Sequence, residues 1–160
     1  MKTNLKNSDV IKKTLFSLVF VAKTKTTKDY AWTVVKNLLI EFESKYDFLN
    51  YIQIDDVKNL HDSVDDIYIK SKFDKLEPKK IGDAFQDIID TFKTRMGTKA
   101  GYFFLREFKE VLGERYFAIL KNMGVDLRLI DLEKQIYGYK AKTYKIKDKF
   151  DSNIAYLEKE

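Results

Sequence analysis

Apolar residues recur at the three- and four-residue spacing that places them on one face of an α-helix along most of this chain. The pattern is clearest between Ala31 and Tyr46, where charged residues fall between the apolar ones. The same spacing predicts helices over residues 8–22, 27–46, 55–67, 78–96, 98–112, 114–122 and 126–138. We therefore expect an all-α protein, a compact bundle of about seven helices.

Residues typical of helix ends support these boundaries. Ser8 can cap the first helix, and Thr26 with Asp29 resembles a capping box at the start of the second. The single proline, Pro78, falls at a first-turn position where its missing N–H costs nothing. Three glycines predict helix ends followed by tight connections: Gly97, Gly113 and Gly124.

One segment, residues 48–54, departs from the helical pattern. It is rich in β-branched and aromatic residues, so the fold could include one short extended segment there. We do not predict a sheet, because no second run of this kind is recognisable as its partner. After it, Asp55 or Asp56 can open a short helix with Leu60 and Ile67 inward and its acidic residues on the solvated side.

Length and composition favour a single globular domain. It would span residues 1–160, with a basic tail from about residue 139. The chain has no cysteine, which excludes disulfides and thiolate chemistry. The apolar patch at residues 15–22 is too short for a signal peptide or a membrane span, so we expect a cytoplasmic protein with no membrane partner.

The net charge of +5 is unevenly distributed. Residues 1–46 carry nine lysines against four acidic residues, whereas residues 47–77 carry four lysines against eight. Lysine also greatly outnumbers arginine, which favours diffuse solvation over the bidentate phosphate recognition typical of arginine. An acidic segment therefore interrupts an otherwise basic chain.

The residues needed for common catalytic sites are missing. His61 is the only histidine, so the chain cannot form a Ser-His-Asp triad or a paired-histidine metal site. Next to Asp62 on a predicted exposed face, it is interpreted as an ordinary surface histidine. The aspartates at 55, 56, 62, 65 and 66 lack EF-hand spacing. We expect no enzyme activity, no cofactor and no metal site.

The segment 95–101 combines glycines, threonine and lysine at a predicted helix N-terminus, where free N–H groups attract anions. It departs from a Walker loop because its lysine precedes the second glycine and a helix precedes the segment. A helix C-cap followed by an N-cap explains it better. With other arginines at predicted helix junctions, the candidate anion or partner contacts are Arg95, Thr98, Lys99, Arg106 and Arg128.

Lysines and tyrosines interleave between Tyr139 and Lys149. In such a pattern cations can contact phosphates while rings stack on bases, although an edge strand or a solvated tail has the same composition. The candidate nucleic-acid contacts are Lys140, Lys142, Tyr144, Lys145 and Lys147.

Three segments together resemble a little-studied family of small archaeal helical proteins described as signal-transduction output domains. The segments are KDYAW at 28–32, RMGTKAGYFF at 95–104 and MGVDLRLI at 123–130. The resemblance covers about residues 9–147. It implies an all-α fold and a regulatory or partner-binding role, and it supplies no site residues.

Helical patterning without a catalytic set favours a non-enzymatic binding or signalling-output module. It would contact a protein partner or a second copy of itself. The large residues Tyr102–Leu105 exceed what one helix face buries and could supply the interface. The alternative is a nucleic-acid-binding, transcription-associated protein that uses residues 139–149.

Overall fold

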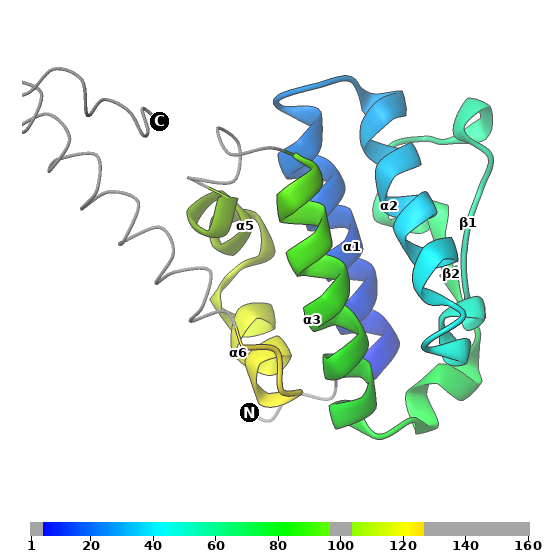
Figure 1. Cartoon of the computed structure of the whole chain (residues 1–160), viewed down its shortest axis with the longest axis vertical. Helices are drawn as coiled ribbons and strands as arrows, with labels where there is room; N and C mark the ends of the chain where they lie inside the picture. The colour runs from blue at the N-terminus through cyan, green and yellow to red at the C-terminus, as the bar shows by residue number, and fades with distance from the viewer. Residues whose placement is uncertain (1–4, 97–103, 127–160) are drawn as a thin grey trace, which may run out of the picture. The chain divides into compact units, whose positions relative to one another are not determined.

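Helices dominate the fold. The computed structural model describes residues 5–96 and 104–126, which are coloured in Figure 1. Three long helices come first, and two shorter ones follow. Their bounds are α1 Asn7–Lys23, α2 Lys28–Phe42, α3 Pro78–Arg95, α5 Phe104–Leu112 and α6 Glu114–Asn122.

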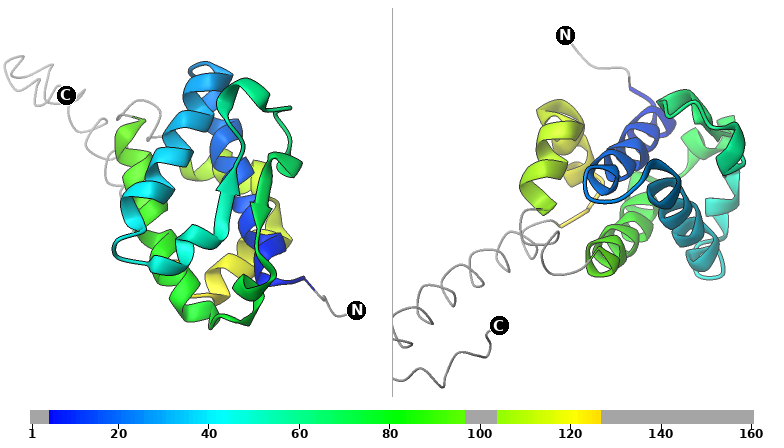
Figure 2. Two further views of the ribbon diagram at one scale, coloured as in Figure 1. Left: turned by 90° about the vertical axis from the view of Figure 1, so that its right-hand side faces the viewer. Right: turned by 90° about the horizontal axis from the view of Figure 1, so that it is seen from above.

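A small antiparallel sheet lies between α2 and α3 in the sequence. It consists of β1 (Ile52–Ile54) and β2 (Ile67–Ile69), with Gln53 paired to Tyr68. The short 3-10 helices that flank the two strands are η1 Asp47–Tyr51, η2 Val57–Asn59, η3 Val64–Asp66 and η4 Ser71–Lys75. Seen from above, the sheet and α5 lie on opposite sides of α1 (Figure 2, right).

α1 is the central helix of the described fold because it packs against α2, α5, α6 and β2. Buried apolar residues lie on more than one side of this helix, and Ile11, Leu15 and Leu18 are fully buried. Two buried hydroxyls interrupt them. The hydroxyl of Thr14 donates to the Val10 carbonyl at 2.8 Å, and that of Ser17 donates to the Lys13 carbonyl in the same way. Both hydroxyls thus find their acceptors within the helix itself.

α3 approaches the chain that follows α6 very closely at Gly82. A Cβ atom at this position would lie 2.0 Å from the carbonyl oxygen of Met123, so only glycine fits. One turn further along α3, the Gln86 amide donates to the Asp126 carbonyl at 3.1 Å and accepts from the Asp126 N–H. These contacts fix residues 123–126 against α3.

The prediction of an all-α bundle of about seven helices is confirmed only in its helical character. Within residues 5–96 and 104–126 the structure has five α-helices and a two-stranded sheet. The predicted helix over 126–138, the stop at Gly97 and the basic tail lie outside the described residues. No helix in the described part of the chain is long and apolar enough to cross a membrane.

The predicted helix over 55–67 is wrong, and so is the statement that residues 48–54 lack a partner strand. The carboxylate of Asp66, only 3% exposed, accepts from the N–H groups of His61 and Ser63. These local bonds hold the backbone in turns and compete with helix formation. Residues 67–69 are left extended and pair with β1.

Several helix boundaries are confirmed. α3 begins at Pro78, α5 ends before Gly113, and Gly124 follows the end of α6, both glycines having positive φ. Other ends differ from the prediction. Thr27, not Thr26, caps α2, because its hydroxyl accepts from the Tyr30 N–H.

The first helix does not use Ser8 as its cap. α1 begins at Asn7, and the Ser8 N–H in its first turn donates to the Asp74 carboxylate at 2.7 Å. α2 ends at Phe42 rather than near Tyr46. The chain turns there, and the Tyr46 hydroxyl donates to Asp87 on α3.

Candidate functional site

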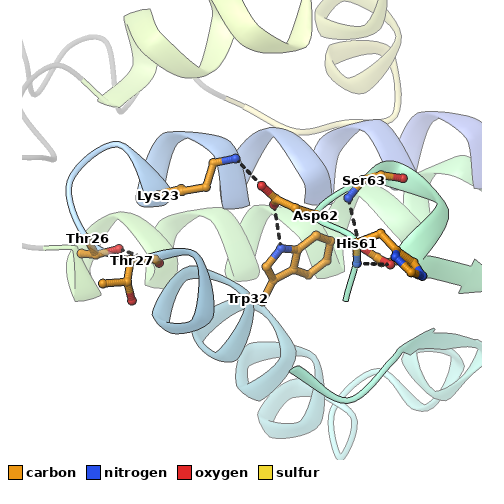
Figure 3. A network of polar contacts seen from close by, with 8 residues as sticks. Lys23, Thr26, Thr27, Trp32, His61, Asp62 and Ser63 are labelled. Atoms are coloured by element: carbon orange, nitrogen blue, oxygen red, sulfur yellow. Dashed lines mark hydrogen bonds and ion pairs between the residues drawn. The ribbon is translucent and has the colours of Figure 1, made fainter. Parts of the chain in front are cut away.

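A polar network joins the loop before β2 to the α1–α2 hairpin (Figure 3). The Asp62 carboxylate accepts from the Lys23 ammonium at 2.5 Å and from the Trp32 indole N–H at 3.0 Å. The side chains of Lys23 and Asp62 are 29% and 22% exposed, so this ion pair is partly buried. Trp32 is a fully buried core residue, and Asp62 accepts the hydrogen bond from its indole N–H.

The backbone at Asp62 is unusual. Its φ of +62° is the only positive value among the described non-glycine residues. Aspartate tolerates this left-handed conformation better than most residues do, because its short polar side chain bonds locally or to neighbours. The conformation directs the carboxylate toward Lys23 and Trp32 (Figure 3).

The charge state of Asp62 follows from its contacts. Burial by itself would raise the pKa of this carboxyl, but hydrogen bonds from Lys23 and Trp32 and the charges of Lys23 and Lys28 lower the pKa overall. The carboxylate is therefore ionised at neutral pH, with both oxygens occupied. Such a group suits structural fixation of the loop better than proton transfer.

His61 is exposed, as the sequence predicts. Its backbone N–H donates to the Asp66 carboxylate, so the residue takes part in the turn through its main chain. No three His, Asp or Glu side chains within the described ranges are grouped to hold a metal ion.

The predicted anion or partner contacts are distributed over separate elements. Arg95 at the end of α3 donates to Glu41 on α2 at 2.7 Å, and this hydrogen bond lowers the pKa of the Glu41 carboxyl. Arg106 is exposed on α5. The structure does not describe Thr98, Lys99 and Arg128, nor the predicted nucleic-acid contacts Lys140, Lys142, Tyr144, Lys145 and Lys147.

In comparisons with protein-family models, curated proteins and solved structures, nothing matches this chain.

One residue of the predicted interface at 102–105, Phe104, is buried within the protein. Phe104 is 1% exposed, and its ring lies 5.7 Å from that of Phe92 and 5.5 Å from that of Phe108. This residue therefore belongs to the core between α3 and α5. The structure does not describe Tyr102, Phe103 or the side chain of Leu105.

The exposed side of α2 carries large apolar residues that the sequence reading missed. Ile40 is 62% exposed and Tyr30 is 48% exposed. Thr33 and Asn37, also exposed, complete an uncharged row at helical spacing. We call Tyr30, Thr33, Asn37 and Ile40 the α2 stripe. The sequence indicates this stripe only through Ile40, a large apolar residue that lies outside the helical positions expected to be buried.

Proposed function

We propose that the chain is a non-enzymatic, cytoplasmic binding module that associates with a second copy of itself through the α2 stripe. The observation that carries the proposal is the exposure of Ile40, the most exposed of the large apolar side chains in the described ranges. Covering an isoleucine this exposed removes apolar surface from water, which stabilises the complex with a partner. The resemblance to signal-transduction output domains would give such a module a regulatory role.

The order of residues in the α2 stripe favours a second copy as the partner. Its members stand at positions 30, 33, 37 and 40, which are symmetric about a point near residue 35. An antiparallel copy centred on that point would place Tyr30 against Ile40 and Thr33 against Asn37. A two-fold interface requires such self-complementarity, because each contact occurs twice.

The charges beside the stripe fit the same arrangement. Asp29 of one copy would face Glu41 of the other, which are like charges. Glu41 already pairs with Arg95 at 2.7 Å, so much of its charge is offset. Arg95, a candidate contact residue from the sequence, would therefore support association by neutralising Glu41.

Ile40→Glu tests this function. It should convert a concentration-dependent dimer into a monomer, because the interface would then bury two unpaired carboxylates. Light scattering coupled to size-exclusion chromatography measures the mass. Ala118→Glu, at an exposed position of α6, is the matched control and should dimerise like the unmodified protein. The proposal fails if the unmodified protein is a monomer at all concentrations or if the two variants behave alike.

Arg95→Ala gives an independent check in the same assay. We expect a severalfold weaker dimer, because Glu41 of both copies loses the cation that offsets its charge. The loss should shrink at high salt, since screening weakens the repulsion between Asp29 and Glu41. An unchanged dissociation constant at low salt would show that Arg95 has no part in association.

A further inference from the structure

The outward side of the two-stranded sheet carries a second feature, independent of the α2 stripe. Ile52, Ile54, Ile67 and Ile69 point inward and are buried, whereas Gln53 and Tyr68 are exposed. The Lys70 N–H donates to the Tyr51 carbonyl at 3.0 Å and so continues the ladder by one step. By strand alternation Tyr51 and Lys70 therefore lie on the same side as Gln53 and Tyr68. Figure 2 (left) looks onto this side of the sheet.

The short helix η4 adds two cations beside the sheet. The Lys72 ammonium lies 4.7 Å from the centre of the Tyr51 ring, in cation–π contact. Residues three apart in a 3-10 helix lie on the same side, so Lys75 accompanies Lys72. Phe73 faces the core and is fully buried. We call Tyr51, Tyr68, Lys70, Lys72 and Lys75 the sheet platform.

Charge is separated along the sheet. Residues 55–66, at one end, hold five acidic residues and one lysine, whereas residues 70–75, at the other end, hold three lysines and one acidic residue. That residue, Asp74, accepts from the Ser8 N–H at 2.7 Å. The basic part of the segment 47–77 therefore lies at residues 70–75, which include the lysines of the sheet platform.

We infer that the sheet platform binds single-stranded nucleic acid. Tyr68, 59% exposed, offers a ring on which a base can stack. Lys72 lies against the Tyr51 ring, and Lys70 and Lys75 are exposed nearby in the sequence, so these three cations can contact phosphates. Rings together with cations distinguish this surface from one that would merely attract an acidic peptide. The inference does not rest on self-association, because it uses a different face.

The test is the binding of a fluorescent oligothymidylate to the full chain, followed by anisotropy over a range of salt concentrations. Each phosphate contact on a single strand contributes about −0.7 to the slope of log affinity against log salt, so replacing Lys70, Lys72 and Lys75 by Gln should flatten the slope by about 2. The matched control replaces Lys109, Arg115 and Lys121 by Gln. These residues lie on α5 and α6 and are exposed. The control should keep the slope.

Tyr68→Ala separates stacking from charge. It should weaken binding about tenfold, and Tyr68→Phe should restore it, since a base stacks on either ring. Absence of binding by the unmodified chain at low salt would overturn the inference. Equal slopes for the two triple variants would do the same. The inference would also be overturned if polyglutamate competed as well as the oligonucleotide and Tyr68→Ala had no effect. The surface would then bind acidic peptides by charge alone.

Discussion

Gly82→Ala should lower the free energy of unfolding by about 1–3 kcal/mol, the usual cost of forcing extra volume into a packed site. Alanine in an exposed helix would instead stabilise by up to about 1 kcal/mol. The added Cβ would lie 2.0 Å from the Met123 carbonyl oxygen, so backbone must move. Urea denaturation followed by the fluorescence of Trp32, the only tryptophan, measures the change.

Asp83→Ala is the control for this prediction. Asp83 is the neighbouring residue on α3, half exposed, and pairs with Lys79 in the same helix. We expect a change within about 0.5 kcal/mol. A Gly82→Ala protein more stable than the unmodified one would show that α3 and residues 123–126 do not approach as described.

Substitutions at Asp62 form the second prediction. Asp62→Ala should cost about 2–3 kcal/mol, because it leaves the Trp32 N–H and the Lys23 ammonium without their acceptor and removes the polar side chain that lets aspartate tolerate positive φ. Asp62→Gly should be about 1 kcal/mol less damaging than Asp62→Ala, since glycine adopts this φ freely. Asp62→Asn, which also tolerates positive φ, should cost least.

The Asp62 contribution should depend on pH. The folded-state pKa of this carboxyl is lowered, so its stabilisation is fully present above the unfolded value of about 3.9 and is lost as the pH falls through the lower folded value. The difference in unfolding free energy between the unmodified protein and Asp62→Asn should therefore be constant near neutrality and shrink below about pH 4. A constant difference down to acid pH would contradict the assigned ion pair.

The sequence predicts best what short-range chemistry decides. Pro78, Gly113 and Gly124 act on their own backbone, and the helix boundaries they indicate are found. The sheet was missed because the run at 67–69 has only three residues and follows turns that Asp66 fixes by its own hydrogen bonds. Such a run can be read as the end of a helix.

Contacts between distant parts of the chain account for the rest. The sequence singles out Arg95, but its partner Glu41 lies 54 residues away and becomes apparent only in the fold. Gly82 could have been noticed as an isolated glycine within a helical pattern, which often marks close backbone approach. Ile40 could have been noticed because it breaks the amphipathic pattern of α2. Neither signal identifies the surface that will cover the residue.

Cross-linking across the α2 stripe tests self-association most directly, because the natural chain has no cysteine. Two single-cysteine variants are prepared, Thr33→Cys and Asn37→Cys, and are oxidised separately and as a mixture. In the antiparallel arrangement position 33 faces position 37, so the mixture should give far more disulfide-linked dimer than either variant alone, a link that requires Cα atoms within about 7 Å. Equal yields from the mixture and the separate variants, or no link at all, would contradict the account.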